Sequence, residues 1–192
     1  MQRGSFEFIV GPMFAGKTEE LLRRIKRATI ARQKVVLFKP LIDDRYSINE
    51  VVSHSGQKLE CVTVDDSISI LSLMRTDYSD YNIICIDEVQ FFDASIVEAI
   101  KCLISEGRRV IATGLSVNFR GELFNPQVGE LMALASQLDK LTAICKVCGT
   151  PAVYNMRMID GKPANWDSPV VLVGGEESYE ARCYKCFSCK HA

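Results

Sequence analysis

The sequence predicts an α/β fold in which helices flank a parallel sheet, followed by a small cysteine-rich domain. Short apolar runs alternate with helix-like patterns over about the first 140 of the 192 residues. Alternation of this kind is typical of parallel sheets with right-handed crossovers. Five of the eight cysteines then lie in the last 48 residues. This change in composition predicts two domains, residues 1–141 and residues 142–192.

The N-terminal part of the predicted sheet contains two strands and a helix. Residues 6–10 form an apolar strand, and residues 18–32 carry apolar side chains at helical spacing with basic side chains mostly opposite. A buried strand at 34–40 ends at Pro40. Residues 41–58 are polar and lose the periodicity, which predicts a long loop.

Two further strands are predicted in the middle of the chain. One spans residues 81–88 and ends in Asp87 and Glu88, and the other spans residues 108–115. In parallel sheets, ligands gather at the carboxyl ends of the strands. The loop after residues 6–10 and the Asp87–Glu88 pair are therefore expected at the same edge.

A helix is predicted between these two strands, over residues 93–107. Its apolar side chains recur on one face. Ser95 and Glu98 have the spacing of a capping box, and Gly107 suits the helix end.

The composition favours a soluble globular protein, with 47% hydrophobic and 24% charged residues. No apolar run approaches the roughly 18–20 residues that span a bilayer, and the N-terminus lacks the features of a signal peptide. We therefore expect a cytoplasmic protein with no membrane partner. The net charge of −1 and the pI of about 6.2 provide no global basic field, so no nucleic-acid partner is expected.

The stretch GPMFAGKT matches the phosphate-binding pattern G-x-x-x-x-G-K-[ST]. Its residues are Gly11, Pro12, Met13, Phe14, Ala15, Gly16, Lys17 and Thr18. The glycines allow successive N–H groups to surround phosphate oxygens, and the following helix adds its dipole. Lys17 is expected to bridge the β- and γ-phosphates, and Thr18 to offer its hydroxyl to Mg²⁺. The flanking strand and helix favour a P-loop NTPase-type domain over a chance glycine-rich turn.

The stretch CIDEVQFF supplies the acidic groups that a nucleotide site needs. Asp87 is placed to hold magnesium from the neighbouring strand, and Val89 and Gln90 are assigned to the same nucleotide site. Glu88 is free for other chemistry. It would orient an attacking water in an ATPase, or accept a proton from a hydroxyl substrate in a kinase. A surface carboxylate without a chemical role is the remaining interpretation.

Two C-x-x-C pairs predict a structural zinc site in the tail, because paired knuckles create a tetrahedral set of thiolates. The pairs are Cys145 with Cys148 and Cys183 with Cys186. Cys189 and His191 offer a competing set with Cys186. The other cysteines are single residues in apolar stretches, where we expect small buried side chains. They are Cys61, Cys85 and Cys102.

Taken together, these motifs resemble those of the type II thymidine kinases of bacteria, poxviruses and animal cytosol. The resemblance is carried by GPMFAGKT, DEVQFF, DDRY at residues 43–46, Gly114–Leu115 with Phe119, VGGEESYEARC at residues 173–183, and the two C-x-x-C pairs. It covers essentially the whole chain in the order of the family.

The resemblance implies transfer of the γ-phosphate of ATP to the 5′-hydroxyl of thymidine, and also of deoxyuridine, in DNA-precursor salvage. Glu88 would be the general base on that hydroxyl. Arg45 would bind the transferring phosphoryl group, and Asp43 would orient Arg45 or the metal-bound waters. Without the resemblance, both residues would read as ordinary loop charges. The family further implies a homotetramer that thymidine triphosphate inhibits.

The resemblance also assigns the nucleoside pocket and the zinc ligands. Residues 142–192 would close over the nucleoside as a lasso, pinned by zinc on Cys145, Cys148, Cys183 and Cys186. Backbone groups of this loop would read the edge of thymine, and leaving them unpaired would reject cytosine. The substrate-binding set would be Met13, Leu115, Phe119, Asn155, Val171, Leu172, Val173, Gly174 and Tyr179.

Two departures from the family pattern affect the nucleoside pocket. Ser116, Val117 and Asn118 follow Leu115 where the family commonly has Asp, and Asn155 stands where Thr or Ser is frequent. A kinase for another nucleoside is therefore one alternative. A nucleotide-gated module whose zinc ribbon binds DNA is another, and the acidic pI argues against it.

Overall fold

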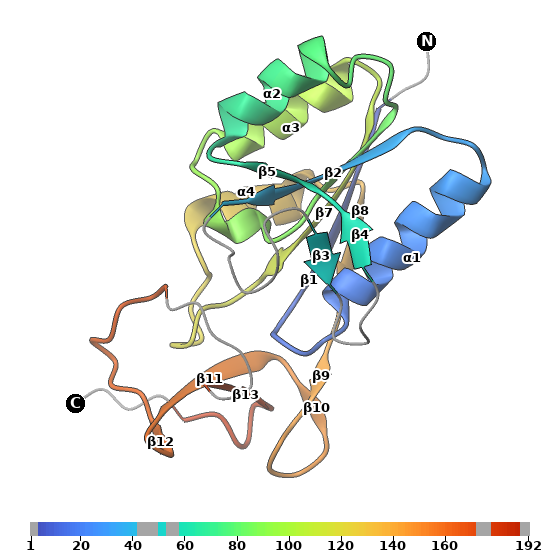
Figure 1. Cartoon of the computed structure of the whole chain (residues 1–192). Coiled ribbons are helices and arrows are strands. Elements are labelled where there is room, and N and C mark those ends of the chain that lie inside the picture. Colours follow the sequence, from blue (N-terminus) through green and yellow to red (C-terminus); the bar gives the residue numbers. More distant parts are fainter. Residues whose placement is uncertain (1–3, 42–49, 53–57, 172–177, 189–192) are drawn as a thin grey trace.

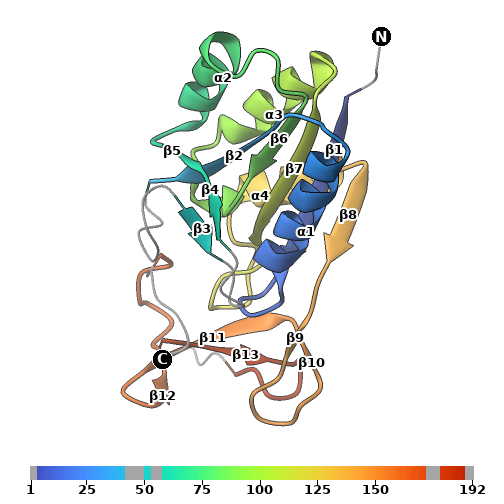
Figure 2. The ribbon, with the colours of Figure 1, turned by 45° about the vertical axis from the view of Figure 1, so that its right-hand side comes forward.

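The computed structural model describes residues 4–41, 50–52, 58–171 and 178–188 (Figure 1). Its main part is a six-stranded sheet with helices on both faces, and a group of small sheets lies at one end (Figure 2). Within the described residues, no helix is long and apolar enough to span a membrane.

The six-stranded sheet is parallel throughout, as the alternating pattern predicts. Its strands lie in the order β5 (Val62–Val64), β2 (Val35–Pro40), β6 (Ile83–Ile86), β7 (Arg109–Leu115), β1 (Ser5–Gly11) and β8 (Gln137–Lys140). The central strands are buried on both faces, which is why they read as continuous apolar runs in the sequence.

Helices cover the two faces of the sheet unequally. The α-helices of the described residues are α1 (Lys17–Ile30), α2 (Ser67–Thr76), α3 (Ile96–Ser105) and α4 (Pro126–Leu134), with a short 3₁₀ helix η1 (Val89–Phe91) after β6. Alternate strand residues face opposite sides. Phe8 packs into the core that α2, α3 and α4 cover, and its neighbour Ile9 packs against α1.

One detail of the helices and one cysteine differ from the sequence prediction. Ser95 caps no helix donor, because both its amide and its hydroxyl donate to the Asp93 carboxylate two residues earlier. The predicted capping box with Glu98 is therefore wrong. Cys61 and Cys85 are buried as expected, but Cys102 is only half-buried and its sulfur contacts Glu106.

The long loop predicted over residues 41–58 contains regular structure. Strand β3 (Glu50–Val52) lies within it and pairs antiparallel with β4 (Lys58–Glu60), which begins at its last residue. The alternation is too short to be recognised in a polar stretch, so the sequence prediction missed this hairpin. The remainder of the stretch lies largely outside the described residues.

The tail forms small antiparallel sheets beyond the carboxyl ends of the main strands (Figure 2). Its strands are β9 (Ala143–Ile144), β10 (Pro151–Ala152), β11 (Tyr154–Ile159), β12 (Lys162–Pro163) and β13 (Tyr179–Arg182). Our proposed domain boundary after residue 141 falls between β8 and β9.

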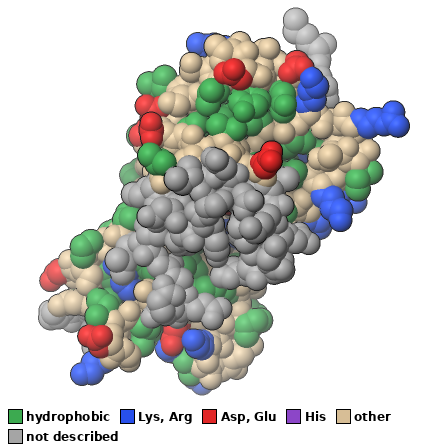
Figure 3. Space-filling model, in the orientation of Figure 1, with side chains coloured by type: hydrophobic (Ala, Val, Ile, Leu, Met, Phe, Trp, Pro, Cys, Tyr) green, Lys and Arg blue, Asp and Glu red, His purple; other side chains and the backbone are tan. Residues whose placement is uncertain are grey.

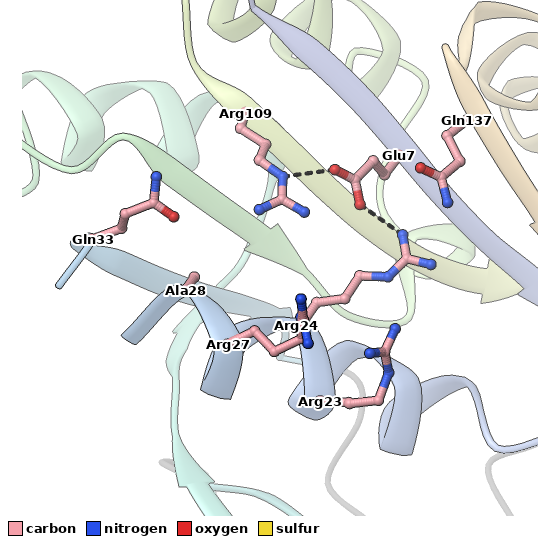
Figure 4. Close-up of a pocket in the computed structure, with 8 residues that line it drawn as sticks. All are labelled: Glu7, Arg23, Arg24, Arg27, Ala28, Gln33, Arg109 and Gln137. Carbon is pink, nitrogen blue, oxygen red and sulfur yellow. Dashed lines mark hydrogen bonds and ion pairs between the residues drawn. The ribbon is translucent and has the colours of Figure 1, made fainter. Parts of the chain in front are cut away.

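An ion-pair network fastens α1 to the sheet beside a pocket of about 390 Å³ (Figure 4). The Arg24 guanidinium contacts three carboxylates, those of Glu7, Glu20 and Asp139, at 2.7–2.8 Å. Arg109 adds a second cation on Glu7 at 2.6 Å. Hydrogen bonds from Arg23 and Arg24 lower the pKa of Glu20 to about 2.

Replacing Arg24 by Met should lower the free energy of unfolding by about 3 kcal/mol, because three carboxylates then face one another without their shared cation. Denaturant unfolding measures the change. The matched control is Arg23→Met, since Arg23 is exposed and its one ion pair among the described residues is with Glu20, so its loss should change the free energy of unfolding much less than the loss of Arg24. Equal losses in the two variants would contradict a structural role for the network.

Candidate active site

The phosphate-loop motif connects β1 to α1 through a backbone that curls back on itself. Gly16 has φ 79 and Phe14 has φ 64, both in the left-handed region. A Cβ on Gly11 would lie 2.7 Å from the Leu141 carbonyl oxygen, so only glycine fits at that position. These constraints account for the two glycines of the motif.

Lys17 is the first residue of α1, and its buried side chain folds back over the loop. Its Nζ donates to the carbonyl oxygen of Pro12 at 2.8 Å. A small cavity of about 50 Å³ lies at the loop. It is lined by Met13, Phe14, Ala15, Gly16, Lys17, Thr18, Glu19 and Glu88. The loop and the end of β6 thus meet at one edge, as the sheet topology predicts.

Asp87 and Glu88 follow β6 in a geometry set by buried neighbours. Asp87 is buried, and its Oδ1 accepts from the Glu88 amide at 3.0 Å and from the Thr113 hydroxyl. Glu88 has φ 50, an uncommon left-handed conformation for a non-glycine residue. Strain of this kind concentrates at functional sites.

Gln90 holds the Glu88 carboxylate in place. Its Nε2 donates to Glu88 Oε2 at 2.5 Å, and its Oε1 accepts from the Leu115 amide at 3.0 Å. Gln90 therefore connects β7 to the carboxylate. The neighbouring Val89 is fully buried in the core, so its side chain contributes packing. Contacts of Val89 and Gln90 with a nucleotide remain predictions.

The four cysteines of the two C-x-x-C pairs come together in the tail. The sulfurs of Cys145, Cys148, Cys183 and Cys186 all lie within 4.8 Å of one another. Cys148 Sγ is 3.6 Å from both Cys183 Sγ and Cys186 Sγ. Tetrahedral zinc with Zn–S bonds of about 2.3 Å needs sulfurs about 3.8 Å apart, so the cluster fits zinc.

Hydrogen bonds at the cluster shift the pKa of two of its thiols in opposite directions. A hydrogen bond with the Thr150 side chain lowers the pKa of Cys183 to about 6. Hydrogen bonding with Cys148 raises the pKa of Cys186 to about 12. Four adjacent thiolates repel one another, and a cation at their centre removes that repulsion. The competing ligands Cys189 and His191 lie outside the described residues.

The four-cysteine cluster packs directly against the phosphate loop. Phe14 and Ala15 contact the small core that contains Cys145 and Cys183. Met13 and Phe14 contact a second apolar group formed by Phe119, Ala164 and Tyr179. The loop thus lies between the main sheet and the tail.

A family model for thymidine kinase matches residues 4–187. The chain belongs to the thymidine kinase family. Membership implies a phosphotransferase. It agrees with the parallel sheet, the phosphate loop and the four-cysteine cluster described above.

Solved structures with a similar chain path include two replication proteins. Domain III of the replication initiation protein DnaA from Thermotoga maritima has 13% identity and a TM-score of 0.43, covering 72% of this chain and 55% of that one. A DNA replication initiation factor has 12% identity and a TM-score of 0.42, covering 71% of this chain and 40% of that one. The chain spans about half the length of these solved chains.

The described residues that the family resemblance assigned to the nucleoside differ in their burial. Phe119 and Tyr179 are buried in one apolar group, Leu115 is half-buried and Val171 is exposed. Asn155 is buried, and both ends of its amide are occupied: Oδ1 accepts from the Met13 amide at 2.7 Å, and Nδ2 donates to the Val117 carbonyl at 3.1 Å. Met13 packs against the group that contains Phe119 and Tyr179. The rest of the nucleoside set, Leu172, Val173 and Gly174, lies outside the described residues, as do the catalytic assignments Asp43 and Arg45.

Four polar residues around the phosphate loop and the tail were missed by the sequence analysis or given another role. Thr113 and Gln90 hold the two acidic residues, whereas Arg120 and Arg157 bind the tail. The sequence did hold one signal for Arg157. It is two residues from Asn155, which was assigned to the pocket, and residues two apart in a strand such as β11 share a face.

Proposed function

We propose that the protein is an ATP-dependent thymidine kinase, which transfers the γ-phosphoryl group of ATP to the 5′-hydroxyl of thymidine, and also of deoxyuridine, in DNA-precursor salvage. One observation carries the proposal: the Glu88 carboxylate lines the same cavity as the phosphate loop. A carboxylate beside the phosphates can receive the proton of an attacking hydroxyl.

In this proposal the loop and α1 bind the phosphates of ATP. Backbone N–H groups and the N-terminus of α1 surround the phosphate oxygens. Lys17 exchanges its contact with the Pro12 carbonyl for the β- and γ-phosphate oxygens. Binding of the phosphates by fixed donors leaves the terminal phosphoryl group aligned for transfer.

Thr18 and Asp87 are the residues that would hold Mg²⁺. A hydroxyl and a carboxylate are oxygen ligands of the kind that Mg²⁺ prefers, and the Thr113 hydroxyl fixes the Asp87 carboxylate. When bound with ATP, Mg²⁺ neutralises charge on the β- and γ-phosphates.

Glu88 then acts as the general base, and Gln90 keeps its carboxylate oriented. The transition state of phosphoryl transfer is loose, so orientation of the hydroxyl and late removal of its proton are sufficient. We assign Arg45 to the charge on the transferring group and Asp43 to the orientation of Arg45. The planar guanidinium suits the equatorial oxygens.

The nucleoside would lie between the phosphate loop and the tail. Phe119, Tyr179, Met13 and Leu115 would form its walls, and backbone groups of residues 171–174 would read the edge of thymine. Because its amide is occupied at both ends, Asn155 would act through the backbone of Met13 and Val117. We further propose a cytoplasmic homotetramer that thymidine triphosphate inhibits, from the family resemblance.

The DNA-binding alternative has no comparable observation in its favour. On the face shown in Figure 3, basic and acidic side chains of the described residues are interspersed. A nucleic-acid site requires clustered basic side chains. Salt-sensitive retention of the protein on DNA would be needed to support that alternative.

The test of the proposed function is a nucleoside panel with [γ-³²P]ATP. Thymidine and deoxyuridine should be phosphorylated, and deoxycytidine and deoxyguanosine should not. The label should be found on the 5′-position of the product. Preferred phosphorylation of deoxycytidine or deoxyguanosine would overturn the thymidine assignment, and the absence of any labelled nucleoside would overturn the kinase proposal.

Replacing Cys148 by Ser should lower the zinc content and sharply weaken thymidine binding, while ATP binding persists. Structural zinc contributes about 10–16 kcal/mol of apparent binding free energy at neutral pH, enough to order a small domain. Metal analysis with separate thymidine and ATP titrations measures these effects. Cys102→Ser, far from the cluster in α3, is the matched control. Normal thymidine affinity in a zinc-free variant would contradict the lasso role of the tail.

A further inference from the structure

The segment of residues 166–170 lies outside any strand, and its backbone oxygens are bound by two arginines. Arg120 donates from Nε to the Trp166 carbonyl at 2.7 Å and from Nη2 to the Ser168 carbonyl at 3.0 Å. Arg120 belongs to the loop after β7. That loop also carries Phe119.

Arg157 binds the last two carbonyls of the same segment. Its Nη1 donates to the Pro169 carbonyl, and its Nη2 donates to the Val170 carbonyl at 2.7 Å. Nε and Nη2 also donate to the Tyr179 hydroxyl at 3.0 and 2.6 Å. Only 2% of the Arg157 surface is exposed, so these contacts are shielded from water.

Both guanidinium groups also lie over the ring of Phe119. The Cζ atom of Arg157 is 4.2 Å from the ring centroid, and that of Arg120 is 5.2 Å away. Cations over an aromatic face are attracted by its quadrupole. Among the described residues, neither guanidinium pairs with a carboxylate, so backbone carbonyls and aromatic rings satisfy both charges.

We propose that Arg120 and Arg157 are positioning residues that act together as an arginine clamp, holding residues 166–170 against Phe119 and Tyr179. This inference rests on the proposed function. The clamp ends one residue before Val171, where the backbone that would read thymine begins. By fixing the preceding carbonyls, the clamp determines where Val171 lies relative to Phe119 and Tyr179.

The chemistry of the clamp requires arginine at both positions. A guanidinium offers donors in a planar fork and can stack on a ring at the same time. Lysine keeps the charge, but its compact ammonium group lacks the planar fork that binds two carbonyls while it lies over the Phe119 ring. Arginine-to-lysine variants therefore remove the clamp geometry without removing the charge.

The test compares Arg120→Lys, Arg157→Lys and the double variant in the full-length protein. Each single change should raise KM for thymidine about tenfold or more, because charge-assisted hydrogen bonds are lost. The kcat at saturating thymidine, the KM for ATP and the zinc content should change little. The double variant should lose less than the product of the single effects, since both arginines hold one segment.

Hydrogen exchange of the protein without substrates provides a second readout. Amide hydrogens of residues 166–171, apart from Pro169, which has none, should exchange faster in both single variants than in the wild type. Arg108→Lys is the matched control, because Arg108 binds the Tyr81 and Ser79 carbonyls at the opposite end of the sheet. That variant should leave thymidine KM and the exchange of residues 166–171 unchanged.

Either of two direct results would overturn the clamp, and a third pattern would do so indirectly. The direct results are an unchanged thymidine KM in Arg157→Lys and unchanged exchange of residues 166–171. A fall in kcat together with a raised KM for ATP and lost zinc would also overturn it, because this pattern indicates general unfolding. Failure of the proposed function would be seen separately, as a wild-type protein that does not phosphorylate thymidine.

Discussion

Replacing Lys17 by Ala is expected to lower kcat by at least about 10²–10³-fold while the protein remains folded. The lost ammonium group acts on β- and γ-phosphate oxygens as charge redistributes in the transition state, and removing one such donor typically costs this much. Gly11 and Gly16 determine the loop backbone, so the loop should keep its path. Initial rates at saturating ATP and thymidine, with thermal unfolding of the same samples, measure both effects.

The control for this experiment lies on the same helix. Lys26 is exposed on α1, and Lys26→Ala should keep wild-type rates. If Lys17→Ala retained more than a tenth of wild-type activity, the loop would not be holding the transferred phosphate. If Lys26→Ala lost as much activity as Lys17→Ala, the effect would come from the helix as a whole.

The central sheet was predictable because its strands are buried on both faces. Strands β1, β2, β6 and β7 appear in the sequence as continuous apolar runs, each followed by a helix or turn signal. The edge strand β8 is different, because its sequence QLDK is mostly polar and exposed. Its place in the sheet is set by pairing with β1, which no local pattern reveals.

The residues of the candidate site also differ in whether a local pattern reveals them. The phosphate loop and the cysteine knuckles are local motifs, so their spacing alone indicates their geometry. Gln90 and Arg157 act through contacts with distant parts of the chain, at Leu115 and Val170, which only the folded structure brings together. Ser95 belongs to a motif that predicted a contact the structure lacks. It has the spacing of a capping box with Glu98, but its hydroxyl donates to the nearby Asp93 carboxylate instead.

Replacing Glu88 by Gln should lower kcat by roughly 10²–10⁴-fold, the usual contribution of a general base, with thymidine binding little changed. The substitution is nearly isosteric and keeps an oxygen that can accept from Gln90 Nε2. The left-handed backbone of Glu88 and its place beside the loop should therefore persist, and only the basicity is lost. Single-turnover rates and equilibrium binding of thymidine separate the two quantities.

The pH dependence gives an independent measure of the same role. In the wild type, kcat should fall at low pH as the essential base is protonated, and this limb should be absent in Glu88→Gln. Glu88→Asp keeps a carboxylate but draws it back from the cavity, so its rate should lie between those of the wild type and Glu88→Gln, with the acid limb retained. A near-normal kcat in Glu88→Gln would mean that the general base is another carboxylate, Asp87 or Asp43. An unchanged rate with a weaker dependence on Mg²⁺ would instead make Glu88 a ligand of the metal shell.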